Sequence, residues 1–208
     1  MRPPNPWLSI PLADYEAHMS LPGVGQAQML AQELDAAAQR VRASSVAVVG
    51  CAGGNGFDGL ADRLQRLVAI DINPAYVEVA RARFGGRHAQ LETYVCDIEQ
   101  SVPACAPVDL VFAGLLLEYV EPVRAMAALR RLCHDEGTLV IVTQVIADEG
   151  QFVSPSPYIA LQALQGFARS CQSAQLEEHA RASGFSSASW RRIRSVGGKS
   201  FDVGDFAR

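Results

Sequence analysis

Four glycines within seven residues form the part of this sequence best suited to binding a ligand. The run VVGCAGGNGFDGL at 48–60 places Gly50, Gly53, Gly54 and Gly56 directly after a short apolar segment. Glycine lets the backbone turn sharply and lets a ligand approach the main chain where a side chain would block it. The alternative is an ordinary tight turn, which needs fewer glycines. The run therefore indicates a ligand-binding loop, although GCAGGNG also satisfies a GxxGxxG dinucleotide pattern.

Two aspartates follow later apolar segments and could complete such a site. Asp71 ends LVAID, 21 residues after Gly50, where an acidic side chain can hold a pair of ribose hydroxyls. An aspartate at this position is equally compatible with NAD. Alternatively, Asp71 could cap the helix that begins near Pro74. Asp97 follows in YVCDIEQ, placed to accept a hydrogen bond from the amine of an adenine, with Ile98 beside the ring. Asp97 is therefore the residue that discriminates between ligands.

Outside the glycine run, the apolar residues follow two different periods. Short continuous apolar runs are typical of strands buried on both faces, and apolar residues three and four apart are typical of helices. Strands are expected at 46–49, 67–71, 91–96, 109–113 and 138–146, with two antiparallel strands at 185–194 and 200–206. Helices are expected at 13–20, 25–42, 57–66, 74–84, 122–134 and 173–182, with a further helical segment at 158–170.

Strands that alternate with helices favour an open, mainly parallel sheet with helices on both faces. We expect an α/β, Rossmann-like, doubly wound seven-stranded sheet that ends in an antiparallel hairpin. The carboxyl ends of parallel strands meet at one edge of such a sheet, and ligands bind there. The fold should therefore bring the glycine run, Asp71 and Asp97 together.

Composition limits the class of protein. The 208 residues fit one domain, and 49% hydrophobic with 19% charged residues is typical of a globular protein. A net charge of −4 gives no sign of a nucleic-acid-binding surface, and no apolar run is long enough to cross a membrane. The first residues lack the pattern of a signal peptide. We expect a cytoplasmic protein that binds neither nucleic acid nor membrane, and the sequence leaves its oligomeric state open.

Lysine and cysteine usage exclude several mechanisms. Lys199 is the only lysine, so there is no GxxxxGK phosphate loop. The five cysteines include no CxxC pair and are expected to be reduced thiols. No bound metal is expected.

Four segments in order resemble the motifs of class I S-adenosylmethionine-dependent methyltransferases. They are VVGCAGGNG, AIDINPAYVEVAR, YVCDIE and DLVFAGLLLEYV. Each motif is degenerate alone, but four of them in order at the usual spacing are specific. The end of the chain after Gly184-Phe185 also resembles the final hairpin of that family, so the resemblance covers about residues 44–206.

The resemblance implies S-adenosylmethionine as the cofactor and S-adenosylhomocysteine as its product. The glycine loop would lie against the methionine part, although Ala52 replaces the commoner middle glycine of the G-x-G-x-G pattern. Asp71 would bind the ribose, and Asp97 with Ile98 the adenine. The residues implied for the cofactor are Gly50, Cys51, Ala52, Gly54, Asp71, Ile72, Asp97, Ile98 and Leu115.

The N-terminal segment IPLADYEAHMSLPGVGQAQML resembles a leader found ahead of this domain in a bacterial subset of the family. The resemblance implies a helical leader at 1–43 that covers the cofactor cleft, and a methyltransferase domain at 44–208. Tyr15, His18, Met19 and Gln26 are then candidates to touch cofactor or substrate. The alternative is that Tyr15 and Met19, four residues apart, are the packed face of a short helix.

In such an enzyme the cofactor carries the reactive methyl group and the protein positions the acceptor. The candidates for catalysis are Tyr15 and His18 in the leader, and Glu118 and Tyr119 after the fourth strand. A general base is needed only if the acceptor arrives protonated. We expect the acceptor to be a small molecule, because no appended domain or basic patch suggests a macromolecule.

Two other functions remain open at this point. An NAD-dependent oxidoreductase is the first, but the short-chain type needs Tyr-x-x-x-Lys, and Ser195 stands four residues before Lys199. A non-catalytic protein that binds an adenosyl cofactor is the second. The acceptor itself cannot be identified. The segment at 147–172 carries Tyr158, Leu161, Leu164 and Phe167 at helical spacing, and it could form a lid over an apolar acceptor or simply pack.

Overall fold

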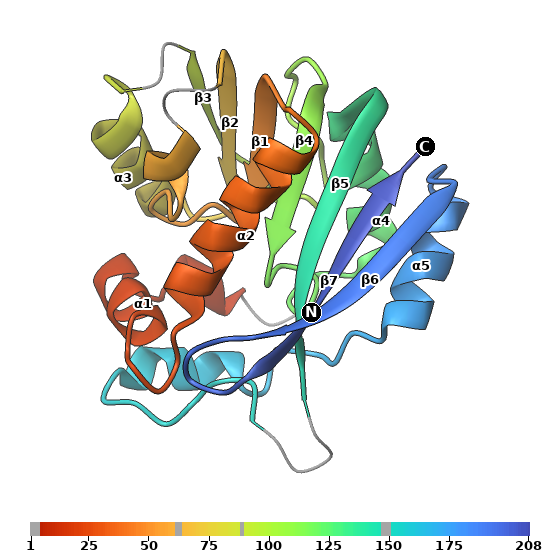
Figure 1. The fold of residues 1–208 in the computed structure, drawn as a ribbon. Helices are drawn as coiled ribbons and strands as arrows, with labels where there is room; N and C mark the ends of the chain where they lie inside the picture. The colour runs from red at the N-terminus through yellow and green to blue at the C-terminus, as the bar shows by residue number, and fades with distance from the viewer. Residues whose placement is uncertain (1–4, 61–63, 88–89, 147–150) are drawn as a thin grey trace.

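The structure is a computed structural model that describes residues 5–60, 64–87, 90–146 and 151–208. Its centre is a seven-stranded sheet in the order β3-β2-β1-β4-β5-β7-β6 (Figure 1). The first five strands are parallel, and β7 is antiparallel to both β5 and β6. The predicted fold class is confirmed. The strands are β1 Ser45–Val49, β2 Arg66–Asp71, β3 Leu91–Val95, β4 Val108–Gly114, β5 Cys133–Val145, β6 Ser187–Arg194 and β7 Ser200–Ala207.

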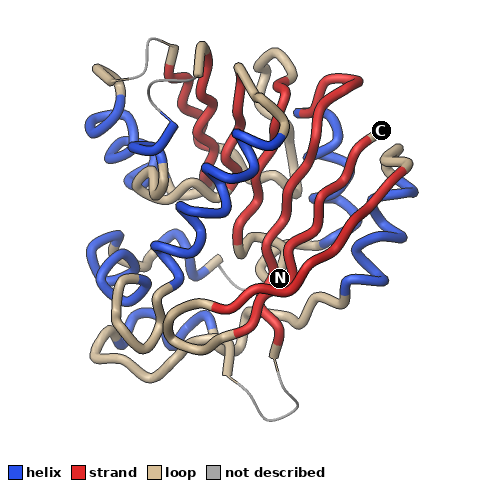
Figure 2. Tube along the Cα trace, viewed as in Figure 1, coloured by secondary structure: helices blue, strands red, loops and turns tan. Residues whose placement is uncertain are grey.

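Helices cover both faces of the sheet (Figure 2). Successive side chains of a strand point to opposite faces, so Val46 and Val48 of β1 pack with α2, while Ala47 and Val49 pack with α4 and α5. Each face therefore has its own hydrophobic cluster. The covering helices are α2 Gln26–Arg40 and α3 Pro74–Phe84 on one face, and α4 Pro122–Leu132 and α5 Ser173–Ala182 on the other.

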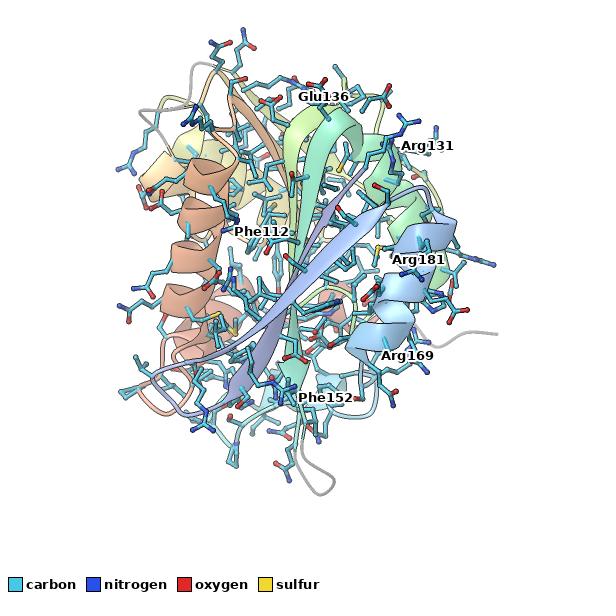
Figure 3. The ribbon with its side chains drawn as sticks, turned by 45° about the vertical axis from the view of Figure 1, so that its right-hand side comes forward. Phe112, Arg131, Glu136, Phe152, Arg169 and Arg181 are labelled. Atoms are coloured by element: carbon cyan, nitrogen blue, oxygen red, sulfur yellow. The ribbon has the colours of Figure 1, made fainter. Side chains whose placement is uncertain are left out.

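Three short elements gather at the end of the sheet where the parallel strands finish (Figure 1). They are the 3-10 turn η1 Pro6–Leu8, the helix α1 Leu12–Met19 and the 3-10 helix η3 Ile159–Leu164. Figure 3 shows Phe152 at this end of the molecule and Glu136 at the opposite end. Segments from both ends of the sequence thus meet over the edge of the sheet that the sequence predicts to bind a ligand.

The expected helix at 57–66 is wrong. The structure has a 3-10 helix, η2 Phe57–Leu60, and Arg66 already belongs to β2; residues 61–63 lie outside the described part of the chain. The N-terminal helix α2 occupies this face instead. Gly56 has a φ of 85°, and a Cβ there would lie 3.0 Å from the Cα of Ala31, so α2 packs closely against the start of this segment.

Two further boundaries differ from expectation. The helical segment at 158–170 is a 3-10 helix only over Ile159–Leu164, and β5 begins at Cys133 rather than at 138. The first residues of β5 pair with β4 before a register shift between Val108 and Leu110. An apolar run marks the buried part of a strand only, so the polar start of β5 could not be read from hydropathy.

Among the residues that the structure describes, no helix is both long and apolar enough to cross a membrane.

Candidate active site

The glycine run forms a loop between β1 and the turn toward η2. Gly50 has a φ of 76° and Gly54 a φ of 91°, in the left-handed region that favours glycine. A Cβ at Gly54 would lie 2.5 Å from the ring of Phe84, so no larger residue fits there. Ala52, which replaces the commoner glycine, also has a positive φ of 47°. The loop therefore keeps the left-handed conformation at the substituted position.

Asp71 anchors this loop from the end of β2. One carboxylate oxygen accepts the N–H of Ala52 and the other accepts the N–H of Asn73, both at 2.9 Å. Asn73, not Asp71, caps α3, because its side chain accepts the N–H of Ala75. Burial raises the pKa of Asp71 to about 6, against the opposing effect of these backbone N–H groups. Each oxygen still has a lone pair for a further hydroxyl donor.

Asp97 follows the end of β3, the strand next to β2, and so lies at the same edge of the sheet as Asp71. Its Oδ1 accepts the N–H of Glu99 at 3.0 Å, and its Oδ2 accepts the amide of Gln100 at 2.7 Å. These bonds fix the carboxylate at the rim. Ile98 is buried with its side chain in the hydrophobic cluster. The pair thus offers one polar acceptor and one apolar surface side by side.

A cavity of about 670 Å³ lies between the glycine loop and the end of β4, where the strand order reverses. Open α/β sheets bind ligands at such a reversal. The predicted cofactor residues that line it are Gly50, Ala52, Asp71, Ile72, Asp97, Ile98 and Leu115. Two predicted residues do not: the Cys51 side chain is buried in the core, and Gly54 borders a separate hollow beside Arg83.

The end of β4 shapes the far wall of this cavity. Leu115 has a φ of 54°, unusual for a residue with a branched side chain, and its N–H donates to the carbonyl of Val142 at 2.8 Å. The strained residue turns the chain sharply after Gly114. As a result Leu115 and Leu116 both line the cavity.

The N-terminal segment forms another wall of this cavity. Trp7 and Tyr15 both line it, and so does Asn5. The amide of Asn73 donates to the carbonyl of Trp7, and the hydroxyl of Tyr76 donates to the carbonyl of Ile10, each at 2.8 Å. These bonds join the segment to the start of α3.

Sequence reasoning missed Trp7 and Asn5. The signal that could have found Trp7 is an aromatic residue between prolines, which hold the backbone extended and leave a large side chain to cover a neighbour.

A second cavity, of about 470 Å³, adjoins the first. All four residues proposed for catalysis line it: Tyr15, His18, Glu118 and Tyr119. Trp7, Tyr15, Leu115 and Tyr119 line both cavities, so these side chains form their shared wall.

The three aromatic rings in that wall pack edge to face. The rings of Trp7 and Tyr15 lie 5.3 Å apart at 84°, and those of Trp7 and Tyr119 lie 5.1 Å apart at 89°.

Glu118 is the most buried ionisable residue of the second cavity, at 1% exposed. Its Oε1 accepts the N–H of Gln144 at 2.7 Å, whereas Oε2 has no hydrogen-bond partner among the described residues. Burial raises the pKa of Glu118 to about 7, against the lowering effect of the Gln144 N–H. A carboxylate with such a pKa can gain and lose a proton near neutral pH.

His18 faces the same cavity from α1 and is 4% exposed. In the described part of the chain its Nδ1 has no hydrogen-bond partner. Burial, followed by the positive charge of Lys199, lowers the pKa of His18, so its ring is neutral at pH 7. Met19 beside it lines the cavity and also packs in the main core, so residues of α1 both pack and border the cavity.

The β5–α5 connection supplies the remaining wall. Leu161 and Leu164 of η3 are buried and line the second cavity with Phe152 and Val153. They form a small cluster with Ile10 of the N-terminal segment. These two leucines therefore pack against the N-terminal segment and also border the cavity.

Solved structures of similar fold come from several organisms. A phosphoethanolamine N-methyltransferase 2 from Haemonchus contortus, bound to phosphomonomethylethanolamine and S-adenosylhomocysteine, has a TM-score of 0.65 at 13% identity. The alignment covers 85% of this chain and 52% of that one, so this chain spans about half its length. The magnesium protoporphyrin IX methyltransferase of Synechocystis with bound S-adenosylmethionine has a TM-score of 0.62 at 16% identity, covering 89% and 81%.

A third similar structure is that of SpnF, named as a [4+2]-cyclase, with a TM-score of 0.64 at 19% identity and coverage of 85% and 82%. At these identities the likenesses establish the fold. No curated protein sequence matches the chain as a relative.

The family model of a methyltransferase domain decides the assignment, because it matches residues 47–141. Residues 47–141 thus match a methyltransferase domain. The matched segment begins in β1 and ends in β5, so it includes the glycine loop, Asp71, Asp97 and Glu118. This match supports the predicted family of S-adenosylmethionine-dependent methyltransferases and does not favour the NAD alternative.

Proposed function

We propose that this methyltransferase binds S-adenosylmethionine in the first cavity and transfers its methyl group to a small molecule held in the second. The observation that carries this proposal is the shared wall of Trp7, Tyr15, Leu115 and Tyr119. A methyl donor on one side and an acceptor on the other would meet there. Methyl transfer requires such an in-line approach and little else from the protein.

The residues of the first cavity fit the parts of the cofactor. Asp71 would accept hydrogen bonds from the ribose hydroxyls, and Asp97 would accept one from the adenine amine beside Ile98. The backbone of Gly50 and Ala52 would lie against the methionine part. Two carboxylates lie where the adenosyl group is proposed to bind, and aromatic side chains lie where the sulfonium is proposed to be, whose positive charge aromatic rings can stabilise.

The cofactor itself supplies a methyl group already activated by the positive sulfur. The protein holds the acceptor against that methyl group and keeps water out. Trp7, Tyr15 and Tyr119 serve both purposes in this proposal, because they cover the junction of the cavities from the N-terminal segment and from the end of β4. An error of about 1 Å in such positioning reduces rates by about a hundredfold.

The predicted division into a leader at 1–43 and a catalytic domain at 44–208 becomes part of this proposal. The hydrogen bonds to the carbonyls of Trp7 and Ile10 support a leader that covers the cofactor. The size and walls of the second cavity support a small-molecule acceptor rather than a macromolecule. All five cysteines are free thiols, which supports a reducing compartment such as the cytoplasm.

The test is a calorimetric titration of the purified protein with S-adenosylmethionine, S-adenosylhomocysteine and NAD. We expect both adenosyl compounds to bind at one site per chain and NAD to give no heat. Binding of NAD alone would contradict the proposal. A competition titration, in which S-adenosylhomocysteine displaces S-adenosylmethionine, checks that both use the same cavity.

The similarity to a protein named as a [4+2]-cyclase supports a second candidate function. In that case the adenosyl cavity is retained and the second cavity serves a reaction other than methyl transfer. Conversion of S-adenosylmethionine to S-adenosylhomocysteine in the presence of an acceptor favours the first candidate. Tight binding without any such conversion across a broad acceptor panel favours the second.

A further inference from the structure

Resting on the proposed function, we infer that the second cavity accepts an uncharged molecule of about one aromatic ring, methylated on a hydroxyl group whose proton passes to Glu118. This inference names the class of acceptor and the group that removes its proton.

The unpartnered polar atoms of the cavity define what the ligand must carry. Glu118 Oε2 and His18 Nδ1 are buried and have no hydrogen-bond partner among the described residues. A buried polar atom without a partner is costly, so each calls for a matching group on the ligand. In its ionised form Glu118 only accepts hydrogen bonds, so the group opposite the ionised carboxylate must be a donor such as a hydroxyl.

The two glutamine side chains of the cavity already have hydrogen-bond partners in the protein. Gln26 Nε2 donates to Gln144 Oε1 at 3.0 Å, and the backbone N–H of Gln144 donates to Glu118. This chain of bonds ties α2, β5 and the end of β4 together and holds Glu118 in one orientation. It leaves Oε2 as the free side of the carboxylate.

The charges around the cavity favour a neutral ligand. Lys199 lies behind its wall, where Nζ donates to the carbonyl of Phe152 at 2.8 Å, and its charge reaches His18. Among the described residues that line the cavity, Glu118 is the one carboxylate, and this cation offsets its charge. The other titratable groups that face Glu118 are Tyr119 and Cys171, and burial raises the pKa of both, so they are neutral at pH 7. A cationic amine would meet Lys199, and a carboxylate would meet Glu118.

The walls favour a flat, apolar ring. Trp7, Phe152, Leu161 and Leu164 surround the space: the first two are aromatic and the last two lie on η3. The lining is more apolar than polar, which fits a single ring that carries one polar substituent.

The reaction balances with these groups. The hydroxyl oxygen of the acceptor forms a bond to the methyl carbon, and the carbon–sulfur bond breaks with its electron pair going to sulfur. The hydroxyl proton passes to Glu118 Oε2, which then releases it to water. The products are a neutral methyl ether, S-adenosylhomocysteine and one proton.

The test uses four probes that share one shape and differ in one group. They are 4-methylphenol, 4-methylanisole, 4-methylbenzylamine and 4-methylbenzoate, each titrated by ligand-observed NMR into the full-length protein with and without saturating S-adenosylhomocysteine. We expect 4-methylphenol to bind most tightly of the four probes. Its affinity should exceed that of 4-methylanisole by about tenfold, because the phenol, unlike the anisole, donates a hydrogen bond to Glu118. Preference for the amine or the benzoate, or no selectivity for the phenol, would overturn the inference.

Two variants test whether 4-methylphenol binds next to Glu118. Glu118→Gln keeps an acceptor for the Gln144 N–H but loses the charge, and should weaken 4-methylphenol about tenfold while S-adenosylhomocysteine affinity stays within twofold. Glu136→Gln, at the opposite end of the sheet (Figure 3), is the matched control and should change neither. Unchanged phenol binding by Glu118→Gln would overturn the assignment.

A third variant, Leu161→Trp, fills the cavity and should abolish probe binding with S-adenosylhomocysteine still bound. The two proposals fail differently: loss of S-adenosylhomocysteine binding contradicts the cofactor site, whereas its retention with no phenol binding contradicts only the acceptor inference.

Discussion

The two cavities at the end of the sheet differ in how their polar groups are satisfied. In the first, both oxygens of Asp71 and both of Asp97 already hold hydrogen bonds from neighbouring residues of the turn. In the second, Glu118 and His18 each leave one buried atom without a partner among the described residues. The first site is pre-organised by the fold, whereas the second has positions that a ligand must complete.

This difference follows from how the two cavities are built. The first lies on the ends of adjacent parallel strands, where backbone N–H groups are available to orient carboxylates. The second is assembled from α1, the end of β4 and the β5–α5 connection, which are far apart in the sequence. Such segments vary more easily than strand ends, because they lie outside the sheet. The comparison therefore assigns cofactor binding to the fold and acceptor choice to its additions.

The largest expected effect comes from removing the carboxylate of the first cavity. Asp71→Ala should weaken the affinity for S-adenosylhomocysteine about a hundredfold or more. The substitution removes two charged hydrogen bonds to the ribose, and it leaves the N–H groups of Ala52 and Asn73 without acceptors. Calorimetry measures this, with circular dichroism to check folding. Asp135→Ala, an exposed aspartate at the other end of the sheet, is the control. Wild-type affinity in Asp71→Ala would remove the ribose assignment.

The next effect concerns the second cavity and its dependence on pH. The folded-state pKa of Glu118 is about 7 against an ordinary value of 4.5, so the native state binds its proton more tightly than the unfolded state does. Stability from this group is therefore present below pH 4.5 and is lost as pH rises to about 7. Glu118→Gln should gain stability relative to wild type over this range, on the order of 3 kcal/mol at most.

Chemical denaturation at pH 5 and pH 8 measures that difference. Asp71 titrates in both proteins, so its contribution cancels. A constant difference between the two pH values would mean that Glu118 is not held in a desolvated environment, and the contrast between the cavities would be weaker.

A smaller effect tests the charge state of Asp71. Ribose hydroxyls donate to the ionised carboxylate, and burial raises its pKa to about 6. Affinity for S-adenosylhomocysteine should therefore fall about tenfold between pH 7 and pH 5. Calorimetry at both pH values provides the comparison. Asp71→Asn should bind weakly at either pH with little dependence on it, and an equally steep dependence in that variant would assign the titration to another group.

The smallest effect concerns the leader. Arg83 of α3 makes two bonds to Glu16 of α1, the second at 3.0 Å, but both side chains are partly exposed. Arg83→Ala should lower the free energy of unfolding by less than about 1 kcal/mol. It should weaken the affinity for S-adenosylhomocysteine by about two- to threefold. Arg81→Ala, whose ion pair stays within α3, is the matched control. An equal loss in both variants would show that α1 does not depend on this contact.

The sequence identifies the first cavity better than the second for physical reasons. Strands buried on both faces leave continuous apolar runs, and the residues that follow them must lie at one edge, so Asp71 and Asp97 could be placed without a structure. The same argument placed Glu118 and Tyr119 after β4. The predicted cofactor residues included Cys51 because of its position in the glycine loop, but its side chain is buried in the core.

The second cavity depends on contacts that no local pattern records. Gln144 supports Glu118 from another strand, and Trp7 covers both cavities from a segment of prolines. The helix expected at 57–66 failed for a related reason, since α2 arrives from earlier in the chain and takes its place against the sheet. Residues that meet only through tertiary packing cannot be paired by their spacing.

The most direct test of the account is a crystal structure of the protein with S-adenosylhomocysteine. We predict that the ribose hydroxyls lie within hydrogen-bond distance of Asp71, that the adenine lies beside Asp97 and Ile98, and that the sulfur faces the wall of Tyr15 and Tyr119. A ligand bound instead in the hollow beside Arg83 and Gly54, with its sulfur away from Glu118, would contradict the account.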